Sequence, residues 1–164
     1  MYRKEVRMIK RIIGQDTEAL SRTNPQWLNL DALAQVEVTS EDAANPIESG
    51  LLPGRESGWR AAQPGPQTVR LVFDQPQKIK RLHLEFHENE VARTQQFTLR
   101  WSSNGGHSYR EIVRQQYNFS PPDTTNQHED YPVDLDGVTN LELNIVPDIS
   151  GGPARASLAQ LRLA

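Results

Sequence analysis

The chain of 164 residues is long enough for one domain with a substantial core and short for two. Its formal net charge of −3 indicates no overall preference for nucleic acid, and the absence of cysteine excludes disulfides, thiolate catalysis and cysteine-ligated zinc. No stretch approaches the length of a membrane-spanning helix, and the N-terminus lacks the unbroken apolar run of a signal peptide. We therefore expect a soluble, cytoplasmic protein without a membrane or nucleic-acid partner.

The first thirteen residues are strongly basic, and only Glu5 is acidic. The cations are Arg3, Lys4, Arg7, Lys10 and Arg11. Val6, Ile9 and Ile13 recur at near-helical spacing, so residues 1–13 form an amphipathic helix, an edge strand or a mobile arm. A basic arm for nucleic acid or anionic lipid is a further alternative, although most charge runs of this kind are a solvated face.

The stretch NPQWLNLDALAQ predicts a short helix over residues 25–34. Asn24 is a suitable cap, and Pro25 suits the first helical position. Three apolar residues at helical spacing follow, namely Trp27, Leu30 and Leu33. At this spacing Trp27 is expected to anchor the core rather than to serve as a platform for a sugar.

From residue 35 onward the hydrophobic period changes to two, which is typical of strands. We expect strands over residues 36–38, 67–74, 79–86, 97–102, 108–114, 131–135, 139–146 and the closing SLAQLRLA. No helical pattern lies between them, which indicates an all-β fold, an antiparallel sandwich or jelly roll. We expect residues 1–34 to form a partly helical N-terminal segment packed on a domain that spans residues 35–164.

The connections between these strands differ in length. Successive antiparallel strands run in opposite directions, so their connections alternate between the two ends of a sandwich. The short turns DQPQK, SSNGGH and Asp136-Gly137 fall at one end, whereas the long connections 87–96, 115–130 and 147–155 fall at the other. Long loops in compact domains tend to be functional, so we expect a recognition surface where the long connections meet.

The long-loop end offers side chains that suit a carbohydrate. Arg, Asn, Glu and His make bidentate or convergent hydrogen bonds with hydroxyl groups, and an aromatic ring packs on the apolar face of a pyranose. The candidate binding residues are His87, Glu88, Asn89, Glu90, Arg93, Tyr117, Asn118 and Arg60. Asp148 is expected near them, and Phe119 in the core. Tyr117 fits either a sugar platform or an apolar cluster under its own loop, and an ordinary solvated loop is the alternative for the polar group.

Four stretches follow a shared pattern: QVEVTSEDAANPIESGLLPGRESGWRAA, VRLVFDQPQKIKRLHLEF, FTLRWSSNGGHSYREI and the closing LAQLRL. Together they resemble the discoidin or coagulation-factor C-type domains, within the galactose-binding-like jelly rolls, and the match covers residues 36–164. The resemblance implies a mostly non-catalytic module that binds galactose-type sugars, phospholipid headgroups or proteins through the loops at one end.

The sequence departs from this family at its calcium site. Many members hold a structural calcium through an Asp-Gly-Asp loop before the W-R-A tryptophan and a glutamate near the C-terminus. Here the loop is LLPGRESG and the terminal position is Gln160, so we expect no metal and no cofactor. The long loops are polar and lack hydrophobic spikes for membrane insertion, which argues against phospholipid as the ligand.

Catalytic and metal chemistry finds little support in the sequence. His83 and His87 are four residues apart, but the alternation of Leu82, Leu84 and Phe86 places them on a strand, roughly 13 Å from each other and too far apart for one ion. A carboxylate pair for glycoside hydrolysis would come from Glu88, Glu90, Asp123, Glu129 and Asp130. No nucleophile elbow, phosphate-binding loop or dinucleotide fingerprint is present.

These observations predict a non-catalytic module that recognises carbohydrate through its long loops. The first alternative is an intracellular protein-interaction module that uses the same loops, as in a DNA-repair scaffold of this fold, and the basic first thirteen residues favour it. The least favoured alternative is a small enzyme that acts on sugars. The expected partner is therefore a carbohydrate or a protein, and the oligomeric state stays open.

Overall fold

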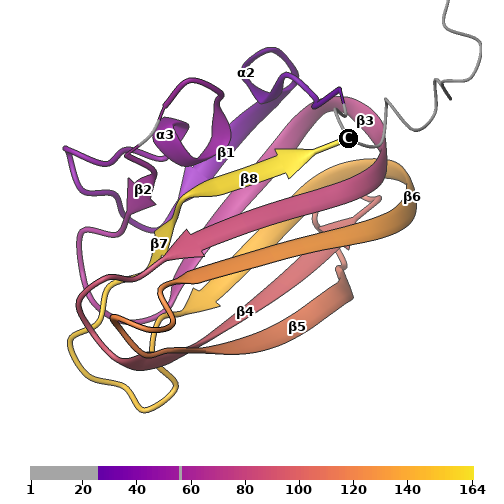
Figure 1. The fold of residues 1–164 in the computed structure, drawn as a ribbon. Helices are drawn as coiled ribbons and strands as arrows, with labels where there is room; N and C mark the ends of the chain where they lie inside the picture. The colour runs from indigo at the N-terminus through magenta and orange to yellow at the C-terminus, as the bar shows by residue number, and fades with distance from the viewer. Residues whose placement is uncertain (1–25, 56) are drawn as a thin grey trace, which may run out of the picture.

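The computed structural model describes residues 26–55 and 57–164, and Figure 1 shows them as a two-layered β-sandwich. The predictions for residues 1–13, Asn24 and Pro25 therefore lie outside the described residues. The all-β antiparallel sandwich predicted from the sequence is confirmed, because every strand pairing is antiparallel. Within the described residues, no helix is long and apolar enough to cross a membrane.

Two long strands contribute to both layers of the sandwich. The strands of the larger layer follow the order β1-β3-β6-β4-β5, with bounds β1 (Ala34–Val38), β3 (Gln67–His87), β6 (Asn126–Val146), β4 (Arg93–Ser102) and β5 (Arg110–Phe119). The second half of β3 pairs with the first half of β6 and with β8 (Gln160–Leu163), and these three segments form the smaller layer. A short pair, β2 (Trp59–Arg60) with β7 (Ser157–Leu158), lies beside them.

Two predicted turns are bends within these long strands. The ladder between β3 and β6 continues through Gln77, which pairs with Val138, and its register shifts on both sides of that pair. The segment DQPQK therefore carries β3 from one layer to the other, and Asp136-Gly137 does the same for β6. Gly137 has φ of +69°, a left-handed conformation that glycine adopts without strain.

The core lies between the two layers and is built from alternate strand residues. Its largest buried side chains come from Trp59, Phe86, Phe97 and Phe119. Phe119 is only 2% exposed, as predicted. The Trp59 indole nitrogen donates a hydrogen bond to the backbone oxygen of Ser40 at 3.0 Å, which satisfies the ring's single polar group.

The predicted helix over residues 25–34 is much shorter in the structure. Only α2 (Leu30–Leu33) is helical, because Ala34 already pairs with Phe73 in the larger layer. Trp27 is half-buried and does not join the core; its ring lies on the outer face of the smaller layer, 5.9 Å from the His83 ring. A second short helix, α3 (Glu48–Leu51), was not predicted.

The long connections are also shorter than predicted, because polar residues extend the strands. β4 begins at Arg93 and β5 runs on to Phe119, while β6 begins at Asn126. Gln95 and Gln127 are buried and face each other across the layers, with a hydrogen bond of 3.1 Å between their amides. The sequence pattern assigns these residues to loops because their side chains are polar, although they point into the sandwich from strands.

The connections separate into two ends, as predicted. The loop end holds residues 88–92, 120–125 and 147–156, and the turn end holds residues 74–78, 103–109 and 136–137. The loop end lies on the left of Figure 1 and the turn end on the right. Backbone hydrogen bonds hold the long loops: the amide of Glu88 donates to Thr125 in the loop before β6, and that of Ile149 donates to Thr94 at the start of β4.

Candidate functional site

Two adjoining hollows lie at the loop end, and Arg60 lines both. The first, called the His87 hollow here, measures about 170 Å³. Its polar lining comes from Asn45, Ser57, Arg60, His87 and Ser157. The second, called the Asp148 hollow, measures about 120 Å³. Its charged lining comes from Arg60, Glu88, Glu90, Asp148 and Arg155.

Arg60 is held by its backbone, while its side chain is exposed. Its amide donates to the oxygen of Asn45 at 3.1 Å, and its own oxygen accepts from Asp42 at 2.8 Å. It also pairs with Ser157 across the β2–β7 ladder. No hydrogen bond or ion pair of its guanidinium to another described residue is present. The backbone is thus fixed, and all five N–H donors remain for a ligand.

Gly58 makes this placement of Arg60 feasible. Its φ is +68°, and a Cβ at this position would lie 2.8 Å from the backbone oxygen of Leu158. Only glycine therefore allows the chain to pass this close to β7 before it enters β2. The predicted binding residue Arg60 depends on this neighbour.

Arg93 has a different position from the one the sequence predicts. Its side chain is 1% exposed, so it faces the interior and not the ligand. Its Nε donates to Glu88 at 2.7 Å, and its Nη1 donates to the backbone oxygen of Pro147 at 2.7 Å. Its guanidinium also lies over the Phe119 ring, at 4.8 Å. Arg93 therefore ties the loop at residues 88–92 to the loop that follows β6.

Glu88 is likewise committed to the loop. One carboxylate oxygen pairs with Arg93, and the other accepts the amides of Glu90 and Val91. Burial alone would raise the pKa of Glu88, but these hydrogen bonds together outweigh it and hold the pKa below its ordinary value of 4.5. Glu88 thus shapes one wall of the Asp148 hollow as a fixed carboxylate.

The remaining acceptors at this end are more open. Glu90 is exposed, and its carboxylate makes no hydrogen bond or ion pair with another described residue. One oxygen of Asp148 accepts the amide of Ser150 at 3.0 Å. Across the hollow, Arg155 reaches the backbone oxygen of Ala61 at 3.5 Å. The Asp148 hollow therefore offers both acceptors and donors within one small space.

His87 lines its hollow, and its ring nitrogen Nδ1 contacts the side-chain oxygen of Asn126. This contact ties the end of β3 to the start of β6 and leaves Nε2 available. Asn89, in the same loop, is exposed. His83 and His87 lie on one strand, and no group of three His, Asp or Glu side chains in the described part of the chain is arranged to hold a metal ion.

Tyr117 and Asn118 are not part of either hollow. The Tyr117 hydroxyl donates to the backbone oxygen of Asn126 at 2.6 Å, and its ring packs against Phe119. Of the two alternatives for Tyr117, the structure therefore has the apolar cluster under its own loop and not the sugar platform. Asn118 accepts a hydrogen bond from Thr94 on the adjacent strand β4, and consecutive strand residues face opposite sides, so it points away from the layer interior.

The sequence therefore locates the loop end but not all of the residues around it. The structure brings Arg60, His87, Glu88 and Glu90 together, whereas Tyr117 and Asn118 lie apart. Asn45, Ser57, Arg155 and Ser157 were not predicted, because serines and single polar residues in Gly- and Pro-rich loops carry no pattern. The only sequence feature that pointed to any of these four residues was the predicted position of the connection 147–155 at the loop end.

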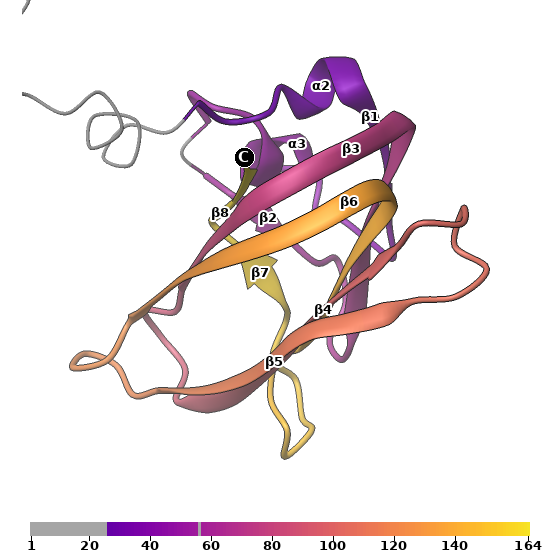
Figure 2. The same cartoon turned by 90° about the vertical axis from the view of Figure 1, so that its right-hand side faces the viewer.

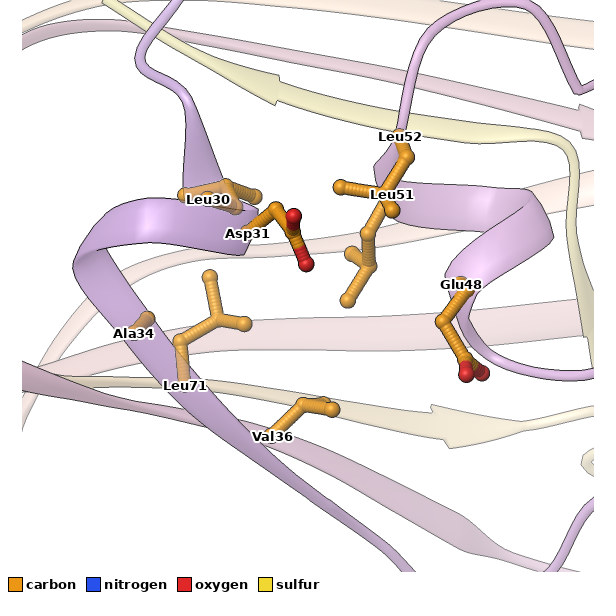
Figure 3. A pocket seen from close by; sticks show the side chains of 8 residues that line it. All are labelled: Leu30, Asp31, Ala34, Val36, Glu48, Leu51, Leu52 and Leu71. Carbon is orange, nitrogen blue, oxygen red and sulfur yellow. The ribbon is translucent and has the colours of Figure 1, made fainter.

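A third hollow, away from the loop end, has a different chemistry. It lies between β1, α2 and α3, measures about 60 Å³, and is lined by leucines together with Val36 (Figure 3). Asp31 and Glu48 also line it. With few polar groups, it does not match the hydrogen-bonding needs of a sugar.

No protein-family model matches the sequence, and no curated protein matches it. Solved structures match it by fold. The family 32 carbohydrate-binding module of NanJ from C. perfringens, solved with galactose, has a TM-score of 0.62 and 13% identity, and the match covers 84% of this chain and 96% of that chain. The family 32 module of AlyQ, solved with 4,5-unsaturated mannuronic acid, has a TM-score of 0.60 and 15% identity, with 85% and 98% covered.

A structure with another kind of partner also matches. It is reduced XRCC1 bound to the catalytic domain of DNA polymerase β, with a TM-score of 0.55, 14% identity, and 80% of this chain and 95% of that chain covered. At these identities the likeness establishes the fold. The chain has the β-sandwich fold of these solved structures, the fold that its motifs predict.

Proposed function

We propose that the chain is a non-catalytic module that binds carbohydrate at the loop end. The observation that carries this proposal is the pair of adjoining hollows at Arg60, in which free hydrogen-bond donors and acceptors face the same space. A sugar hydroxyl both donates and accepts, so a binding site needs both kinds of partner. The sugar complexes among the matching folds support the proposal.

A binding role fits the chemistry of the acids better than a hydrolytic role. Glycoside hydrolysis needs one carboxyl group that stays protonated and a second that is ionised. Glu88 is held ionised by Arg93 and two amides, and its pKa is lowered rather than raised. Glu88 is therefore suited to holding the loop and accepting hydrogen bonds, and not to donating a proton.

The proposal is tested by titrating the full chain with a panel of neutral and acidic oligosaccharides by calorimetry. We expect at least one to bind, and the variant Glu90→Ala to weaken that binding several-fold. The matched control is Glu111→Ala, which removes an exposed carboxylate from β5, away from both hollows. If no oligosaccharide binds, or if both variants bind as the wild type does, the assignment of carbohydrate binding to these hollows is wrong.

One observation favours the second candidate function, protein binding. The apolar hollow lies at β1, the edge strand of the larger layer, where Val36 is 37% exposed. Asp31 and Glu48, which also line it, favour a partner segment that carries both apolar and cationic side chains. A peptide of that chemistry should bind the wild type and fail to bind Val36→Asp, while Glu90→Ala leaves its affinity unchanged.

A further inference from the structure

We propose that the His87 hollow binds an oxyanion carried by an acidic saccharide, a carboxylate or a sulfate ester, and that Arg60 is its principal partner. This inference rests on the proposed carbohydrate binding and adds the class of ligand. It starts from the contrast between the two hollows, which share Arg60 but differ in their other polar groups.

The described lining of the His87 hollow is rich in donors and contains no carboxylate. The donors are the guanidinium of Arg60, the amide of Asn45 and the hydroxyl of Ser157. An oxyanion accepts hydrogen bonds only, so it satisfies such a lining better than a hydroxyl group does. A planar guanidinium can also pair with a carboxylate or a sulfate through two parallel hydrogen bonds.

The Asp148 hollow offers the complementary chemistry. Glu90 and Asp148 accept hydrogen bonds, so they suit the hydroxyl groups of a sugar ring and would repel an anion. Arg60 lines both hollows. A saccharide that places its charged group beside His87 and its ring hydroxyls beside Asp148 would therefore use both sets of side chains.

The Arg60 guanidinium has no ion-pair partner among the described residues of the loop end. One acid of the Asp148 hollow, Glu88, is already paired with the buried guanidinium of Arg93. Asp42 and Asn45 engage only the backbone of Arg60. In the described part of the chain no carboxylate forms an ion pair with the Arg60 guanidinium, so its N–H donors are available to an oxyanion in the His87 hollow.

The test is a calorimetric titration of the full chain at low ionic strength with three matched probes. They are an oligogalacturonate, a sulfated galacto-oligosaccharide and a neutral galacto-oligosaccharide. We expect one of the acidic probes to bind about tenfold or more tightly than the neutral one, because a charge-assisted pair is stronger than a neutral hydrogen bond. Whichever acidic probe binds identifies the oxyanion as a carboxylate or a sulfate ester.

The variant Arg60→Gln separates this inference from the proposed function. It should weaken binding of both probes, because Arg60 lines both hollows, but it should weaken the acidic probe about tenfold more than the neutral probe. The matched control Arg114→Gln removes an exposed arginine on β5, outside both hollows, and should change neither affinity. Thermal unfolding of both variants should match the wild type, since neither side chain is buried.

Two results would overturn the inference, and they differ from a failure of the proposed function. If the neutral probe binds as tightly as the acidic probes, carbohydrate binding stands and the oxyanion assignment falls. Inorganic sulfate is titrated separately as a control. If it binds as tightly as the acidic saccharides, the hollow is a plain anion site and the saccharide class is wrong. If none of the probes binds, the inference falls together with the proposed function.

Discussion

The loop end and the turn end of the sandwich use polar residues in different ways. At the turn end, a hairpin joins β4 to β5 (Figure 2). Its polar groups bond to one another: the hydroxyl of Ser102 donates to Asn104 and accepts the amide of Gly106, and the amide of Gly105 donates to Thr139. At the loop end, the anchoring groups are buried beneath the loops, with Arg93 at their centre. Polar side chains above them stay free for a ligand.

The difference shows how a rigid binding surface can be built from long connections. A buried guanidinium provides several directional bonds that hold two loops at once, and the exposed residues then need no internal partners. Arg93 and Arg60 lie at the same end of the molecule and represent the two halves of this arrangement. Substitution of Arg93 should therefore lower the stability, whereas substitution of Arg60 should lower the affinity for ligand and leave the stability unchanged.

The largest effect is expected for Arg93→Met. This change leaves the Glu88 carboxylate and the Pro147 oxygen without their partner, and breaking a buried ion pair from one side costs about 3 kcal/mol or more. Urea unfolding measures the loss. The control Arg114→Met removes an exposed pair with Glu111 and should cost less than about 1 kcal/mol. Similar losses for the two variants would contradict the anchoring role of Arg93.

A smaller effect is expected for a matched pair of glycine substitutions. Gly105→Ala at the turn end meets open space, so its cost is that of a left-handed alanine, about 1 kcal/mol. Gly58→Ala at the loop end adds a contact of 2.8 Å with the Leu158 oxygen and should cost about 1–2 kcal/mol more. Thermal unfolding of both variants tests the order, and equal losses would show that β7 yields to the new methyl group.

The pH dependence of stability sharpens the comparison further. Because the folded-state pKa of Glu88 is below its ordinary value of 4.5, its contribution is fully present above that pH and is lost as the pH falls through the lower folded value. The wild type should therefore lose more unfolding free energy than Glu88→Gln between neutral pH and pH values below 4.5. Urea unfolding across this range measures the difference, and parallel profiles would rule out the Glu88 contribution.

The smallest effect is expected for Tyr117→Phe. The change removes one hydrogen bond to Asn126 and keeps the ring contact with Phe119, so it should cost about 1 kcal/mol. Because Tyr117 lies outside both hollows, saccharide affinity should stay unchanged. A loss of binding without a loss of stability would show that the Tyr117 hydroxyl contacts the saccharide, which the account excludes.

The fold was predictable because apolar alternation survives in most strands. Phe97 and Leu99 of β4, like Leu82 and Leu84 of β3, are buried at every second position, and the hairpin glycines mark the turns. The alternation becomes polar near the loop end, where Arg93, Gln95 and Gln127 take the buried positions. Periodicity of hydrophobic residues cannot recognise a strand whose interior side chains bond to one another.

The helix and the site show a second limit. Local signals predicted a helix over residues 25–34, but the amide of Leu28 bonds to Leu163 and Ala34 pairs with β3, and these distant partners shorten it. Arg60 and His87 were found because their types suit a ligand and their segments reach the loop end. Arg155 and Ser157 were missed because only the pairing of β2 with β7 brings them beside Arg60.

Amide chemical shifts of the full chain during an oligosaccharide titration report whether saccharide binds at the two hollows around Arg60. We expect the largest changes on residues 57–60, 87–91 and 148–158, with little change at the turn end or beside Val36. Saturable binding with its largest shifts at the turn end, or on the β1 side of the sandwich, would place the binding site elsewhere.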